Sequence, residues 1–116
     1  MAVKPFTTTF RADGVRFLFW EGVTENDTCA PVILMGLEGA VGDLQAVGTF
    51  GSASVALQGS NDQATYAALN DQNGDAIALS AEGAADFSTA MLQIRPHPTG
   101  GSSQDLDLYL CLREGR

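Results

Sequence analysis

One segment near the C-terminal end of the chain alternates without interruption: Asp105-Leu106-Asp107-Leu108-Tyr109-Leu110-Cys111-Leu112-Arg113. Every even-numbered position in it is leucine, and successive side chains of a β-strand point to opposite faces of a sheet. The segment therefore predicts a strand that sends four leucines into a core. Tyr109 and the other odd-numbered residues then face outward or towards a neighbour.

Shorter alternating or apolar runs precede this segment, and turn residues separate them. They cover residues 6–10, 15–21, 32–35, 44–50, 52–59, 65–69, 76–79 and 90–95. Thirteen glycines and four prolines are spread along the chain, and the single helical turn that we expect is Glu82 to Asp86. The pattern predicts an all-β fold, an antiparallel β-sandwich or jelly roll of about eight short strands, with a small up-and-down barrel as the lesser alternative.

The chain has 116 residues, which is enough for one domain. We expect residues 1–14 to form an extended N-terminal arm and residues 15–116 to form a single β-sandwich domain. The arm is predicted from Pro5 and from the isolated rings of Phe6 and Phe10.

The charge balance excludes two classes of partner. Fourteen acidic residues oppose six basic ones, which gives a formal net charge of −8. Without a cluster of Lys and Arg, the chain is predicted to bind neither nucleic acid nor an anionic membrane surface. It has no apolar run of the about 20 residues that a membrane helix needs, and Met1 to Pro5 does not read as a secretory signal. We therefore expect synthesis in a cytoplasm.

Reactive groups are few, and we predict no catalytic residue, no cofactor and no metal site. Cys29 and Cys111 are expected to be free thiols, and His97 lies between two prolines without a nucleophile motif near it. The segment Asp71 to Asp75, with Glu82 behind it, has the ligand spacing of a calcium loop. Ala76 stands where that loop needs glycine, so a polar hairpin turn is favoured.

Aromatic rings concentrate in the first twenty residues. Exposed rings could form a sugar-binding platform, but rings are commoner in cores, so we expect Phe17 and Phe19 to pack inside. For Phe6 and Phe10, docking on a neighbouring subunit is at least as good an interpretation.

A series of short motifs carries a resemblance to a known family. In order these are Gly48-Thr49-Phe50-Gly51, Ser54-Val55-Ala56-Leu57-Gln58-Gly59-Ser60-Asn61-Asp62, Leu69-Asn70-Asp71 with Gly74, Ile94-Arg95-Pro96, Gly100-Gly101 and Asp105-Leu106-Asp107. With Trp20-Glu21-Gly22-Val23 and Asp27-Thr28 further upstream, the chain resembles the head decoration (cement) proteins of tailed bacteriophages.

This resemblance implies a non-enzymatic protein of the virion surface. Such a protein is made in the host cytoplasm, binds the outside of the head and stabilises contacts between major capsid protein subunits. It implies self-association, as a trimer first and otherwise as another small homo-oligomer. We expect Phe6, Phe10, Trp20 and Tyr109 to contribute to its interfaces.

Three other functions stay open at this stage. Val55 to Asp62 is similar to a turn of discoidin-type sugar-binding jelly rolls, although Gln63 and Tyr66 replace the Gly and Trp of that motif. A carbohydrate-binding module is therefore one alternative, and a minor tail or connector protein is another. A small hydrolase that uses His97 is the third.

Overall fold

The predicted leucine strand lies at the centre of a two-layered β-sandwich. The computed structural model describes residues 2–12, 14–34 and 40–113. Its strands are β1 (Ala2–Lys4), β2 (Thr7–Ala12), β3 (Val15–Val23), β4 (Asp27–Cys29), β5 (Val32–Ile33), β6 (Ala40–Thr49), β7 (Ala53–Ser60), β8 (Ala67–Ala68), β9 (Ala78–Leu79), β10 (Gly83–Thr89), β11 (Gln93–Gly100) and β12 (Asp105–Arg113). Within these ranges there is no helix, and so none that could cross a membrane.

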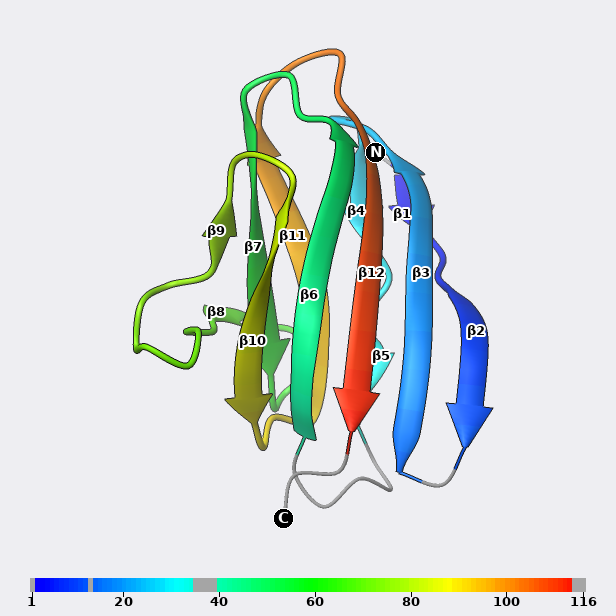
Figure 1. The fold of residues 1–116 in the computed structure, drawn as a ribbon, viewed down its shortest axis with the longest axis vertical. Coiled ribbons are helices and arrows are strands. Elements are labelled where there is room, and N and C mark those ends of the chain that lie inside the picture. Colours follow the sequence, from blue (N-terminus) through cyan, green and yellow to red (C-terminus); the bar gives the residue numbers. More distant parts are fainter. Residues whose placement is uncertain (1, 13, 35–39, 114–116) are drawn as a thin grey trace.

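Two antiparallel sheets form the layers. The β12 sheet has the order β10-β6-β12-β3-β2. The β11 sheet has the order β5-β11-β7-β8, with β9 also paired to β7, and lies behind the β12 sheet in Figure 1. β1 and β4 form a separate parallel pair. The predicted fold class, an antiparallel β-sandwich, is confirmed.

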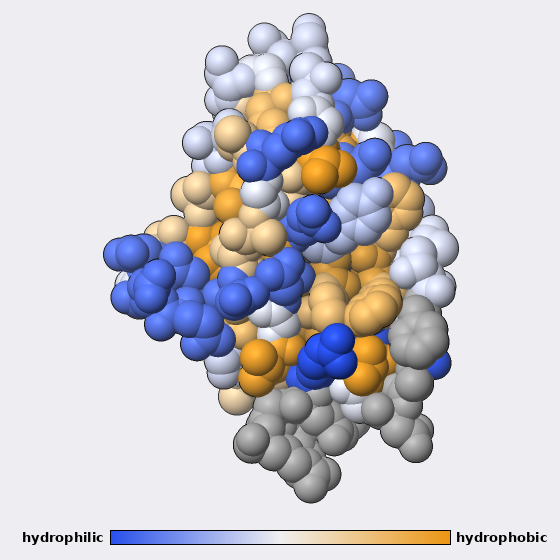
Figure 2. Space-filling view, in the orientation of Figure 1, coloured by the Kyte–Doolittle hydropathy of each residue, from blue (hydrophilic) through white to orange (hydrophobic). Residues whose placement is uncertain are grey.

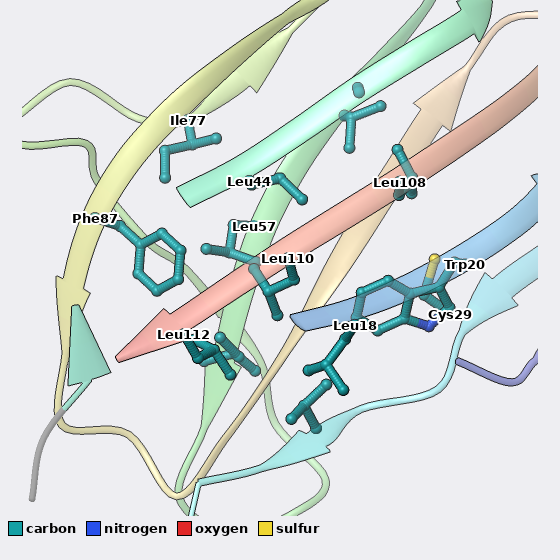
Figure 3. Close-up of a cluster of buried hydrophobic side chains, with 14 of the residues drawn as sticks. Leu18, Trp20, Cys29, Leu44, Leu57, Ile77, Phe87, Leu108, Leu110 and Leu112 are labelled. Atoms are coloured by element: carbon teal, nitrogen blue, oxygen red, sulfur yellow. The ribbon is translucent and has the colours of Figure 1, made fainter. Parts of the chain in front are cut away.

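Alternation along the central strands builds the core. The four leucines of β12 are buried, and they share the interior with Leu44 of β6 and Leu57 of β7. Trp20 and Phe87 are the largest buried side chains, both with 0% of their surface exposed. Figure 3 shows Trp20 close to Cys29 at one end of this cluster and Phe87 at the other. The core therefore extends beneath the β12 sheet from β10 to β3.

The N-terminal residues pair with the sandwich in this structure. β2 is the edge strand beside β3, and β1 pairs with β4. The ring of Phe6 meets that of Trp20 edge-on, with centroids 5.5 Å apart. The boundary expected between residues 14 and 15 falls in the β2–β3 hairpin, and residue 13 is outside the described ranges.

Two local predictions were wrong. Glu82 to Asp86 is not a helical turn, because residues 83–89 pair with β6 along their whole length as edge strand β10. β11 also does not end at Pro96. It continues to Gly100 along β7. Pro96 and Pro98 have no N–H to donate, but β5 pairs with β11 only at Gln93 and Ile94, so no β5 residue needs a donor from either proline.

Candidate functional site

The outer face of the β12 sheet carries stacked aromatic rings. Tyr109 of β12 lies directly opposite Phe19 of β3. Since Leu108 and Leu110 point inward, both rings point outward, and they stack with centroids 4.7 Å apart and planes 15° from parallel. Tyr109 keeps 40% of its surface exposed. We call this surface, with Phe17, Phe19 and Tyr109, the aromatic face.

The aromatic face continues one row along the strands. Phe17 lies opposite Cys111, and the guanidinium of Arg113 lies 6.0 Å from the Phe17 ring centroid. A hollow of about 240 Å³ opens here. Its walls are formed by Thr9, Phe17, Leu18, Gln45, Tyr109, Leu110 and Cys111. Figure 2 shows apolar surface over this part of the sheet, interrupted by hydrophilic side chains.

A pair of carboxylates borders the aromatic face. Asp43 of β6 is the direct partner of Asp86 on edge strand β10, and Cys111 flanks Asp43 on the other side. Burial, and then a hydrogen bond and repulsion from Asp86, raise the pKa of Asp43 to about 6. In weakly acidic solution the protonated Asp43 carboxyl therefore donates a hydrogen bond to Asp86.

The structure separates the residues predicted for an interface. Tyr109 is on the exposed aromatic face, as expected. Trp20 is fully buried, so it cannot contact a partner in this conformation, and Phe6 packs against the core beside it. The backbone of Phe10 pairs with Phe17, while its side chain lies outside the described part of the chain.

Phe17 and Phe19 were predicted to be core residues, and this was wrong. Both are half-buried on the outer face. Leu18 and Trp20 are buried, so the residues of opposite parity point away from the core. The sequence is apolar at every position from 17 to 20 and therefore did not show which parity faces inward.

The outer face of the β11 sheet has a different character. Successive cross-strand pairs along it are Ser60–Gln93, Gln58–Arg95 and Ala56–His97. The alternation predicted for residues 53–58 is confirmed, because Ala53, Val55 and Leu57 are buried. We call this surface the Arg95 face.

Arg95 is held by neutral side chains. Its guanidinium carbon lies 3.7 Å from the centroid of the Tyr66 ring, and its Nε and Nη2 donate to Gln58 Oε1 at 3.3 and 3.2 Å. The buried Gln93 amide donates to the Tyr66 hydroxyl. None of the described acidic residues forms an ion pair with Arg95. Sequence reasoning missed this cluster, since Tyr66 reaches it from a loop.

The other candidates for chemistry form no reactive centre. Burial, and then the charge of Arg95, lower the pKa of His97, which lies opposite Ala56. In the Asp71 turn, the Asp71 carboxylate accepts from the amides of Asn73 and Asp75, whereas Glu82 accepts from Gly48 on another part of the fold. The predicted polar turn is confirmed. No three His, Cys, Asp or Glu side chains gather as a metal site among the described residues.

The comparisons with known proteins support the fold. No protein-family model matches the chain, and no curated protein matches it. Among solved structures it is similar to the SPBc2 prophage-derived protein YomS, with 8% identity, 91% of this chain and 99% of that chain covered, and a TM-score of 0.64. It is also similar to an RmlC-like cupin protein from Desulfovibrio desulfuricans, with 7% identity, 95% of this chain and 83% of that chain covered, and a TM-score of 0.46. The sandwich of YomS thus has the same fold over nearly its whole length.

Proposed function

We propose that this protein is a structural component of a phage particle, a decoration protein that coats the outside of the head. In this role it binds the major capsid protein and copies of itself, as a trimer, through non-covalent contact surfaces. The observation that carries the proposal is the stacked pair Phe19–Tyr109, with Tyr109 40% exposed, on a sheet face that no other element of the described chain covers.

Physical chemistry favours a contact surface there. Aromatic side chains are enriched in protein interfaces because they bury a large area while losing little conformational freedom. The hollow beside Tyr109 offers a recess for a partner side chain. The described residues contain no catalytic arrangement that would give this face another purpose.

Two likenesses support a phage origin. The sequence motifs resemble those of phage head decoration proteins, and the fold is similar to that of a prophage-derived protein. A carbohydrate platform built on Trp20 is disfavoured, because that ring is buried.

The test is attachment to heads that lack the protein. Tyr109→Asp places a charge in the aromatic face and is expected to abolish co-sedimentation with such heads. Thr99→Asp, on the opposite outer face, is the matched control and is expected to bind normally. Undiminished binding of Tyr109→Asp, with its melting temperature unchanged, would refute the aromatic face as the contact.

Copy number separates a decoration protein from the tail alternative. A decoration protein is expected in numbers comparable to the capsid subunits when purified particles are analysed by gel densitometry. A stoichiometry like that of a single tail or portal ring would identify a minor tail or connector protein instead.

A further inference from the structure

The hollow on the aromatic face lies between two rows of residues that pair across the β12 sheet. Tyr109 lies opposite Gln45 in the first row, and Cys111 lies opposite Asp43 in the second. Asp43 therefore borders two walls of the hollow, because Cys111 is its cross-strand partner and Gln45 lies two positions further along β6 on the same face. The carboxylate pair and the hollow are neighbours on one surface.

The second row continues to the edge of the sheet. Asp86 of β10 is the next residue in it, directly opposite Asp43, and β10, β6 and β12 lie side by side in Figure 1. Ala84 and Ser88 flank Asp86 on the same outer face, and both are small and exposed. The carboxyl of Asp86, and through it the half-buried one of Asp43, is therefore accessible from the solvent.

The described part of the chain supplies no counter-ion for this pair. The titratable and charged side chains that face Asp43 from the neighbouring strands are Asp86 of β10 and, on β12, Cys111, Tyr109 and Arg113. The Arg113 guanidinium lies towards Phe17 of β3, 6.0 Å from its ring centroid, on the other side of β12 from Asp43. Burial and Asp86 raise the pKa of Asp43, and no cation lowers it. An incoming cation would therefore meet two carboxyl groups without a positive partner.

The spacing between the hollow and the carboxylates fits an extended segment that crosses the strands. Neighbouring strands are about 4.8 Å apart, so Asp43 is one strand spacing from Cys111 and Asp86 is two, about 10 Å in all. Side chains two residues apart in an extended segment lie about 7 Å apart on the same side, and an arginine side chain reaches further still. An apolar side chain in the hollow therefore places an arginine two residues on at the carboxylates.

The walls of the hollow suit an apolar side chain. Phe17 and Tyr109 supply aromatic surface, and Leu18 and Leu110, whose positions face the core, close it from below. Its volume of about 240 Å³ is enough for a leucine side chain. Among cations, a guanidinium can bond both oxygens of a carboxylate at once and is weakly hydrated, so it is the best match to a partly buried pair.

We propose that the aromatic face binds an extended segment of the major capsid protein in which an apolar side chain is followed, two residues on, by an arginine. The apolar side chain occupies the hollow, and the guanidinium binds Asp43 and Asp86. This inference rests on the proposed function and adds the chemistry of the partner. A second copy of this chain is less suited as the partner, since its 14 acidic residues outnumber its six basic ones.

Binding of the arginine is expected to depend on pH. A guanidinium favours the ionised form of both carboxyls, so it must displace the proton that Asp43 holds below its pKa of about 6. The affinity is therefore lower at pH 5 and rises to a plateau above about pH 7. His97, the one histidine of the chain, lies on the opposite outer face and does not contribute to this rise.

The experiment titrates the isotope-labelled full chain with the peptide acetyl-Gly-Leu-Ser-Arg-Gly-amide at low ionic strength and follows amide shifts by NMR. One control peptide has glutamine in place of arginine, and a second has alanine in place of leucine. Saturable shifts are expected at residues 43–45 and 109–111, with each control peptide at least about threefold weaker at pH 7.5. Equal affinity for the glutamine peptide, or shifts confined to other residues, would overturn the proposal.

Asp43→Asn is expected to lower the affinity for the arginine peptide about threefold at pH 7.5 and to remove its rise between pH 5 and pH 7.5. Asp75→Asn, which loses the same charge on the exposed turn between β8 and β9, is the matched control and keeps both the affinity and the rise. An equal loss in the two variants would indicate general attraction to an acidic protein and would overturn the site.

Attachment to heads distinguishes a failure of this inference from a failure of the proposed function. If Tyr109→Asp detaches the protein from heads while the native protein binds no peptide, the aromatic face is the capsid contact and the partner chemistry proposed here is wrong. If the peptide binds while Tyr109→Asp leaves attachment intact, the capsid protein is not the partner of this face. Shifts of the same amides with protein concentration alone would assign the face to a second copy and would also overturn the proposal.

Discussion

Asp43 and Asp86 lie directly opposite each other on β6 and β10, and the carboxyl of one is hydrogen-bonded to that of the other. Like charges at such positions destabilise a sheet unless a proton is shared. Burial, and then the hydrogen bond and repulsion from Asp86, raise the pKa of Asp43 from its ordinary 3.8 to about 6.

Asp43→Asn is expected to stabilise the protein at neutral pH. The folded state holds a proton that the unfolded chain releases, so stability is complete below pH 4 and falls as the pH rises to about 6. The full shift would correspond to about 3 kcal/mol, but solvent screening of this partly exposed pair reduces it to about 1 kcal/mol. Urea unfolding at pH 5 and pH 7.5 measures the effect. Asp75→Asn is the control. An Asp43→Asn variant no more stable at pH 7.5 than the native chain would contradict the raised pKa of Asp43.

Gly42→Ala is expected to be strongly destabilising, by about 3 kcal/mol. A Cβ at Gly42 would meet the Cys111 carbonyl oxygen and lie 2.8 Å from Cζ of the buried Phe87 ring. Gly83→Ala is the matched control, because its Cβ would meet nothing nearer than 3.8 Å. Equal melting temperatures for the two variants would show that both the Phe87 ring and the β12 backbone at Cys111 can move aside.

The two thiols are expected to differ in reactivity. Cys29 is 2% exposed, and burial raises its pKa to about 12, whereas Cys111 is half-buried beside the hollow on the aromatic face. The thiolate is the reactive form, so one thiol should react with Ellman's reagent in the native protein and the second only in denaturant. Cys111→Ser should remove the first phase. Reaction of both thiols in the native state would contradict the burial of Cys29.

Removal of residues 1–12 is expected to destabilise the domain. The deletion removes the strand that pairs with β3. It also removes the Phe6 ring that contacts Trp20, the one tryptophan of the chain, and so exposes the indole to water. A lower melting temperature and a red shift of the tryptophan emission should result. Phe6→Ala should give a milder form of both, about 1–3 kcal/mol, while Val3→Ala, at a side chain that is 65% exposed, should change neither. A truncated chain with unaltered stability and emission would instead identify the segment as a detachable arm.

The alternation of β12 was enough to predict a strand with one buried face, because its side chains repeat every two residues. The series of short runs separated by turn residues then predicted the sandwich. The same rule did not locate Phe17 and Phe19, whose segment is apolar on both faces. Gly83 to Thr89 was misassigned near its start because local propensity is weak there, and pairing with β6 decides its conformation. The Arg95 cluster could not be predicted, because it depends on the position of the loop that carries Tyr66 and on the pairing register of β7 with β11. Neither can be inferred from the sequence around Arg95.

The two outer faces of the sandwich point in opposite directions (Figure 1), and this has a consequence for a coated particle. A copy that binds the capsid through its aromatic face leaves the opposite face, with Arg95, exposed to solvent. Each head would then display the cation many times at regular spacing. A partner that meets a coated head would contact this face in many copies at once, so that even a weak single contact would be strengthened by avidity.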